Sequence, residues 1–156
     1  MHAPKRLPRG GSAAVELAIL LPFLLALLLG IWEIGRLTES QQLISNAARE
    51  GGRQASYGTV AAGQVQTVVK NYLTNAGLPT KNATITVTNA TSPGTDPASA
   101  AQFDQLKVSV TIPVQDLRWT ATSTFVGPGA VLTGESIWYS MKNKDYPSPS
   151  DPPIDY

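Results

Sequence analysis

Glu16 is the residue whose chemistry most needs an explanation, because it is the single charged residue in the apolar run from Ala13 to Trp32. A carboxylate at the centre of a membrane helix costs roughly 2.5–3.5 kcal/mol, and less near the membrane interface. In apolar surroundings an ionised group needs an opposite charge or hydrogen-bond donors beside it. Glu16 is therefore expected either to pair with a positive charge or to lie near enough to the membrane edge to be tolerated.

Residues suited to enzymatic chemistry are scarce in this chain. It has no cysteine, and its one histidine is His2, near the start. Disulfides, cysteine-based metal or redox sites, catalytic triads and histidine-rich metal sites therefore lack the residues they require. The carboxylates are scattered, with no motif that places two of them on one site. The sequence predicts a protein that is not an enzyme and that holds no metal and no cofactor.

The overall charge balance argues against a nucleic-acid partner. Charged residues make up 15% of the 156 residues, against about 25% in typical soluble domains, and the formal net charge is +1. No strong basic field is available to attract phosphates. The chain is long enough for a membrane segment and one small domain.

The segment around Glu16 has the length of a membrane span. About 20 residues from Ala13 to Trp32 would form roughly 30 Å of helix, which matches the thickness of a bilayer core. Lys5, Arg6 and Arg9 precede this run, while Asp and Glu are absent from residues 1–11. The basic flank predicts a cytoplasmic N-terminus and an extracytoplasmic remainder.

Three interpretations of this N-terminus compete. A secretory signal peptide would have a shorter apolar region and a small-x-small cleavage site, and "LLLGIWEIGR" offers no such site. A plain signal anchor explains the length and the basic flank but leaves Glu16 without a role. The third interpretation rests on a resemblance: "KRLPRGG-SAAVE-LAILLPFLLALLLG" is similar to the class III, type IV-prepilin-like signal.

That resemblance implies a cleavage site and a role for Glu16. In such proteins a dedicated membrane aspartic peptidase removes a basic leader that ends in Gly, and a Glu stands fifth in the mature chain. A cut between Gly11 and Ser12 makes Glu16 the fifth residue, whereas a cut after Gly10 makes it the sixth. By this resemblance Ser12 would carry the new ammonium, and Glu16 would neutralise the terminus of a neighbouring subunit during docking and assembly. Leu17 stands where major Flp pilins have Tyr, which argues against a major pilin subunit.

A longer stretch, about residues 9–55, resembles the TadE-like (TadE/TadF) pseudopilin family of the tight-adherence (Flp) pilus system. It contains "GGSAAVELAILLPFLLALLLGIWEIGR" and "ISNAAREGGRQAS". The matching positions are Pro22, Gly30, Glu33, Gly35, Arg36 and the block 46–53, which reads NAAREGGR. Beyond residue 55 only the layout is similar.

The helical pattern continues past the membrane run, and it predicts one helix from Ser12 to about Ala55. Pro22 lacks an N–H and is expected to kink this helix or loosen the preceding turn. The 46–53 block permits two interpretations. It is either a helix end with a solvated basic face or, together with Glu33 and Arg36, a partner surface that uses Arg49, Glu50 and Arg53.

The remaining chain predicts a small α+β head of the pilin-like kind. A second helix is expected from about Val60 to Ala76, capped by Thr59 and stopped at Gly77. Alternation predicts strands at 83–89, 106–114 and 135–142, in an antiparallel sheet that is covered on one side. Trp119 and Phe125 are expected to anchor the loop before the last strand. The Pro- and Asp-rich residues 143–156 are expected to form a disordered tail.

The sequence thus divides into a leader (1–11), a membrane segment (12–35), an extracytoplasmic head (36–142) and the tail (143–156). The resemblance implies a pseudopilin or minor pilin-like subunit in the bacterial inner membrane, with a single pass. Its partners would be the prepilin peptidase, other pilin-like subunits, inner-membrane pilus assembly proteins and membrane lipid. An uncleaved, membrane-anchored extracellular binding or adhesion module is the alternative. An enzyme would need Ser–Lys or paired-carboxylate chemistry, which no motif here provides.

Overall fold

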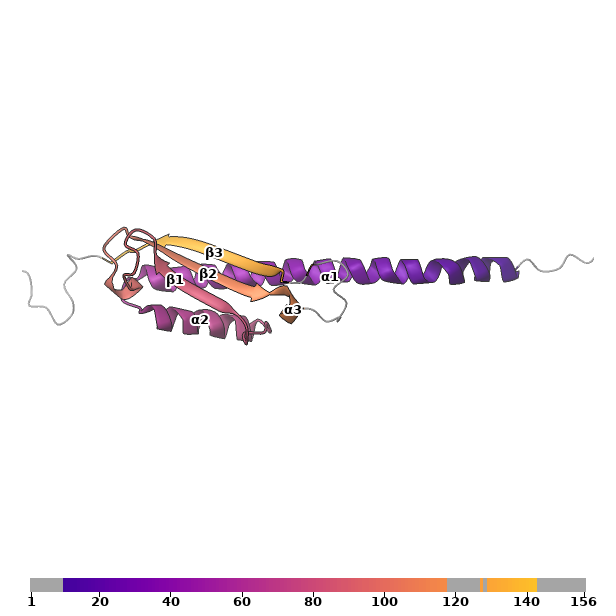
Figure 1. Cartoon of the computed structure of the whole chain (residues 1–156), viewed down its shortest axis with the longest axis horizontal. Helices are drawn as coiled ribbons and strands as arrows, with labels where there is room; N and C mark the ends of the chain where they lie inside the picture. Colours follow the sequence, from indigo (N-terminus) through magenta and orange to yellow (C-terminus); the bar gives the residue numbers. More distant parts are fainter. Residues whose placement is uncertain (1–9, 118–126, 128, 143–156) are drawn as a thin grey trace, which may run out of the picture. The chain divides into compact units, whose positions relative to one another are not determined.

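The computed structural model describes residues 10–117, 127 and 129–142, and the chain divides between Arg36 and Leu37 into two compact units (Figure 1). Most of the expected leader, the loop with Trp119 and Phe125, and the expected tail lie outside the described residues. The described elements are two principal helices, a three-stranded sheet and two short helical turns. The predicted α+β class, with a long apolar N-terminal helix and a small antiparallel sheet, is confirmed.

The first helix, α1, spans Gly10–Ser56 and continues through Pro22 without a break in its helical backbone. Large apolar side chains between Val15 and Ile34 are all exposed. Among the described residues, this is the one helix long and apolar enough to cross a membrane. Its length and composition fit a single-pass membrane anchor, since the apolar surface finds no cover within its own unit.

The second helix, α2, spans Ala62–Asn75, and its end follows the predicted stop signal. Gly77 adopts a φ of 76°, and the Leu78 N–H donates to the Leu73 carbonyl at 2.9 Å. This is the hydrogen bond of a Schellman motif, for which glycine is favoured because it has no Cβ to strain the left-handed backbone.

The predicted cap at Thr59 is wrong. The helix begins after Ala61, which has no side-chain cap. Instead the Ala62 N–H donates to Oδ2 of Asp96 at 3.2 Å, from a residue 34 positions away. The N-terminal N–H of α2 is therefore satisfied by tertiary structure and not by the preceding residue.

The sheet has the order β1-β2-β3, and both strand pairs are antiparallel. The strands are β1 Thr84–Asn89, β2 Gln105–Pro113 and β3 Val131–Tyr139. In β2, buried and half-buried residues alternate strictly, so that Leu106, Val108, Val110 and Ile112 all face the core. The opposite face carries hydroxyl and charged side chains, which confirms the expectation of a sheet covered on one side.

Two predicted strand limits are corrected. The strand β2 was expected to end at Val114, but Val114 is the first residue of a short helix, α3 Val114–Leu117. A 3-10 turn, η1 Pro97–Ser99, precedes β2. The last strand begins at Val131, not at Glu135, and ends at Tyr139. It passes through Gly134, where a Cβ would lie 2.8 Å from the Ile44 carbonyl oxygen. Glycine is present here because the strand lies against the backbone of α1, not because the strand stops.

The core lies between the sheet and both helices. The second part of α1 contributes Ile44, Ala47, Ala48 and Ala55, and α2 contributes Val65, Val69 and Leu73. Ala61 and Ala76, at the two ends of α2, are only half-buried. At roughly 25 cal/mol per Å², burying such side chains is the main stabilising contribution to this unit.

Helix α1 also follows β3 along the edge of the sheet. The Gln41 side-chain amide donates to the Thr133 carbonyl at 2.9 Å, and the Met141 N–H donates to the Ser56 carbonyl at 2.7 Å. Residue numbers rise in the same direction along both segments between these two bonds. The strand β3 and the adjacent part of α1 therefore run parallel to each other (Figure 1). The α1–β3 seam, defined by these two hydrogen bonds, satisfies edge groups that would otherwise be open to pairing with another strand.

Candidate functional site

Glu16 lies in the second turn of α1, on a helix whose neighbouring side chains are exposed and apolar. The Ser12 hydroxyl donates to Oε1 of Glu16 at 3.1 Å, across one helical turn. Residues four apart share a helix face, so this contact follows directly from the sequence spacing. The structure thus places the two residues of the predicted cleavage and docking site within hydrogen-bond distance of each other.

Pro22 lies one and a half turns after Glu16 and inside the helix. It supplies no N–H to the ladder, so the hydrogen bond it would make to the preceding turn is lost. The helical backbone nevertheless continues on both sides of it. The kink stays a prediction.

The small residues of the 46–53 block pack inside the head. Ala47 and Ala48 are fully buried, and a Cβ at Gly51 would lie 2.5 Å from Cγ2 of Val69 and 3.1 Å from Cγ1 of Val108. Gly51 therefore allows α1 to approach both α2 and β2 closely. The small residues of this block thus pack against elements of the same chain.

The charged residues of this block face outward. Arg49 and Arg53 are exposed, and Glu50 is half-buried beside them. Arg53 holds Glu50 through two hydrogen bonds, Nη2 to Oε1 at 2.6 Å and Nε to Oε2 at 2.9 Å. Its Nη1 donates to the Tyr57 hydroxyl at 2.7 Å. These charges form a solvated cluster, and their use as a partner surface stays a prediction.

The electrostatics of this cluster follow from the hydrogen bonds. The Arg53 side chain, and then the Gln54 amide, donate to the Glu50 carboxylate and hold its pKa below the ordinary value. The same pair raises the pKa of Arg53. Both shifts favour the ionised forms, so Glu50 and Arg53 act as an ion pair.

Glu33 and Arg36, the other two residues of the predicted partner surface, are half-buried on α1 within the N-terminal unit. Arg49, Glu50 and Arg53 belong to the second unit. The predicted surface is thus divided between the two units.

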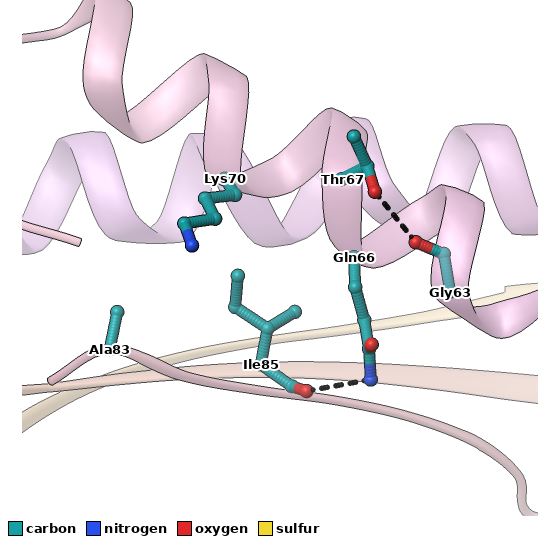
Figure 2. Close-up of a pocket in the computed structure, with 6 residues that line it drawn as sticks. All are labelled: Gly63, Gln66, Thr67, Lys70, Ala83 and Ile85. Atoms are coloured by element: carbon teal, nitrogen blue, oxygen red, sulfur yellow. Dashed lines mark hydrogen bonds between the residues drawn. The ribbon is translucent and has the colours of Figure 1, made fainter. Parts of the chain in front are cut away.

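A shallow groove of about 310 Å³ lies between α2 and β1 (Figure 2). Gln66 reaches across it and donates from Nε2 to the Ile85 carbonyl at 3.1 Å, while the Thr67 hydroxyl donates back to Gly63. Lys70 is the only ionisable residue in its lining, so the groove has no acid–base pair. In the described part of the chain, no group of three or more His, Cys, Asp or Glu could hold a metal.

Sequence reasoning missed the residues that connect distant segments. Asp96, Gln41 and the buried pair Asn89–Asp104, joined at 2.7 Å, are examples. Asn89 lies at the end of a Thr-rich strand and Asp104 just before an apolar one, and no spacing pattern links them. A polar residue beside a buried strand was the one available signal, and it is not specific.

Comparison with known proteins agrees with the resemblance of the N-terminal segment. A family model described as TadE-like protein matches residues 11–53. No curated protein and no solved structure matches the chain significantly. The family match begins at Gly11, ends at Arg53 and includes neither α2 nor the sheet. Residues 11–53, which form nearly all of α1, are therefore TadE-like, and the family resemblance inferred from their sequence is confirmed.

Proposed function

We propose that this chain is a pseudopilin or minor pilin-like structural subunit that is needed to assemble a tight-adherence (Flp) type IV pilus. The TadE-like match suggests involvement in the Tad/Flp pilus system. The observation that carries the proposal is the coincidence of this match with an exposed apolar run, Ala13 to Trp32, whose one carboxylate is Glu16. A role in assembly accounts for both the apolar surface and the charge.

Processing is the first step of this role. A prepilin peptidase cuts between Gly11 and Ser12, so that Glu16 becomes the fifth residue of the mature helix. The cut leaves an ammonium on Ser12, and such a charge in apolar surroundings requires a partner. In the uncut chain the Glu16 carboxylate accepts a hydrogen bond from the Ser12 hydroxyl. This bond gives Glu16 a partner before the cut creates the ammonium.

Docking is the second step. Glu16 of one subunit pairs with the Ser12 ammonium of its neighbour, while the apolar side chains of α1 pack between subunits or against lipid. The chain lies in the bacterial inner membrane with its N-terminus in the cytoplasm and its head outside. Other pilin-like subunits and inner-membrane assembly proteins are its partners, and it performs no catalysis.

Intact-mass measurement of the chain isolated from membranes of a host that has the peptidase tests the processing step. The mature protein should begin at Ser12, and Gly11→Val should retain the whole leader. A wild-type chain that keeps residues 1–11 in such a host would instead favour the uncleaved adhesion module.

The docking step is tested separately with Glu16→Gln, which keeps the size of the side chain and removes its charge. This variant should be cut as the wild type is, because the change lies beyond the cleaved bond. It should co-purify with its pilus partners at least about tenfold less well, since one unpaired buried charge costs several kcal/mol. Glu39→Gln, an exposed position on the same helix, is the matched control. Undiminished co-purification of Glu16→Gln would refute the docking role.

A further inference from the structure

Four large exposed side chains belong to one end of the sheet, where β2 begins and β3 ends. Ile137 is 58% exposed, Tyr139 56%, Met141 60% and Phe103 70%. Alternation along β3 places Ile137 and Tyr139 on the same face, and Met141 continues that spacing. The Phe103 N–H donates to the Ser140 carbonyl at 2.9 Å, which holds Phe103 beside this end of β3. We call these four residues the apolar corner.

Phe103 has an unusual backbone for an exposed aromatic residue. Its φ is 68°, the one positive φ among described residues other than glycine. A bulky residue in this region is strained by about 1 kcal/mol or more. The buried Asn89–Asp104 contact and the Asp104 N–H bond to Ala101 hold the loop in place. Phe103 is thus held in a strained backbone conformation with its side chain 70% exposed.

The chain itself continues from this corner. Lys142, directly after Met141, precedes fourteen residues that read NKDYPSPSDPPIDY. Their apolar members are four prolines and the side chains of Tyr146, Ile154 and Tyr156. Pro-rich segments bind aromatic surfaces because their extended conformation loses little entropy on docking. We propose that residues 143–156 dock on the apolar corner of their own chain.

Reach and geometry favour this occupant. Asn143 and Asp145 are residues that readily form turns, so the chain can reverse there. The eleven residues from 146 to 156 would span roughly 34 Å in a polyproline conformation, more than the ~20 Å of strand from Met141 back to Glu135. A tether this short gives an effective concentration in the millimolar range, which a second copy does not reach.

The prolines also determine how the segment lies. Proline has no N–H to donate, so the segment cannot extend the sheet as a regular strand. At the two ends of the free edge, Thr133 and Met141 are already bonded to α1. The proposed contact is therefore with the open face and not with the strand edge. This inference does not depend on the proposed pilus function.

The absence of cysteine from the chain permits a direct test. Ile137→Cys introduces a thiol within the apolar corner, and Thr67→Cys introduces one at an exposed position of α2 as the control. Each is made in the full chain and in a chain that ends at Lys142, in lipid nanodiscs. Removal of the tail should speed maleimide labelling at position 137 roughly tenfold, as expected when a local cover is lost, and should leave position 67 unchanged.

A second variant separates docking from mere presence of the tail. Tyr146→Ser, Ile154→Ser and Tyr156→Ser together, in the full chain, should label at position 137 as fast as the truncated chain. Amide hydrogen exchange in β2 should stay unchanged and so verify the fold. Equal labelling of position 137 with and without the tail would overturn the proposal. Protection that disappears on dilution would also overturn it, because the tail would then come from a second copy.

Discussion

The two parts of α1 use one helix in opposite ways. The apolar part, residues 11–36, contains fourteen large aliphatic or aromatic residues, and all of them are exposed. The core part, residues 37–56, is far more polar, yet its Ala and Gly residues are buried. Burial within the protein therefore follows from periodic sorting of side chains and not from total hydrophobicity, because the more hydrophobic part of α1 is the exposed one.

The largest expected effect is a difference in the free energy of unfolding between substitutions at two isoleucines of α1. Ile44→Ala removes a fully buried side chain and should lower the free energy of unfolding of the head by about 2–5 kcal/mol. Ile31→Ala, at a position 61% exposed, should leave it unchanged. Urea unfolding of the full chain in nanodiscs, followed by amide exchange in β2, measures both. Equal losses would contradict the division of α1 into two parts.

An introduced charge should be tolerated in the core part of α1 and not in the apolar part. Leu25→Arg, in the apolar part, should reduce membrane insertion by about 2.5–3.5 kcal/mol. Gln42→Arg, at an exposed position of the core part, should insert normally. The fraction of each variant that resists extraction from membranes by alkaline carbonate is the measurement. Normal insertion of Leu25→Arg would show that the apolar part does not span the bilayer.

Substitution by alanine should change stability in opposite directions at two glycines of α1. At Gly51 the new Cβ would press on Val69, and overpacking by about 1–3 kcal/mol should exceed the gain of about 1 kcal/mol in helix propensity. At Gly35 a Cβ meets nothing within 4 Å, so Gly35→Ala should only stabilise the helix. Amide exchange around each position, by mass spectrometry, tests the pair. A stabilising Gly51→Ala would mean that α2 can move away from α1.

The smallest expected effect is the loss of the Glu50–Arg53 stabilisation at low pH. The folded state holds the pKa of Glu50 below its ordinary value of 4.5, chiefly through the hydrogen bonds from Arg53. The stabilisation is therefore complete above pH 4.5 and is lost as the pH falls through the lowered pKa. The advantage of the wild type over Glu50→Gln in urea should be small, because the pair is exposed, and should vanish once the pH has fallen below the lowered pKa of Glu50. Glu39→Gln, which lacks this ion pair, serves as the control, and an advantage that grows in acid would contradict the assignment.

Local patterns in the sequence predict most of the elements. The length of α1, the stop at Gly77 and the alternation in β2 each depend on neighbouring residues, and each agrees with the structure. The TadE-like resemblance depends on a contiguous block and was also identified. Such features are determined by interactions within one or two turns, which a single sequence contains in full.

The differences arise where distant residues meet. Thr59 is a good cap by type, but Asp96 satisfies the N–H of Ala62 from a loop. Gly134 resembles a strand boundary, whereas it is the point at which β3 packs on the backbone of α1. The Glu50–Arg53 pair follows from the i,i+3 spacing of the two residues, but nothing in that spacing shows whether the cluster, in which Arg53 also donates to the Tyr57 hydroxyl, faces a partner. Spacing reports the face of an element, but it does not report which element covers that face.

The α1–β3 seam has a mechanical consequence. Its hydrogen bonds join the helix to a strand that runs in the same direction, at Thr133 and again at Met141. A tension drawn along α1 would load both attachments and the packing between them in shear, so that they resist together instead of peeling apart one by one. The second part of α1 is thereby fastened to the sheet by two bonds that share the load of a pull along the helix.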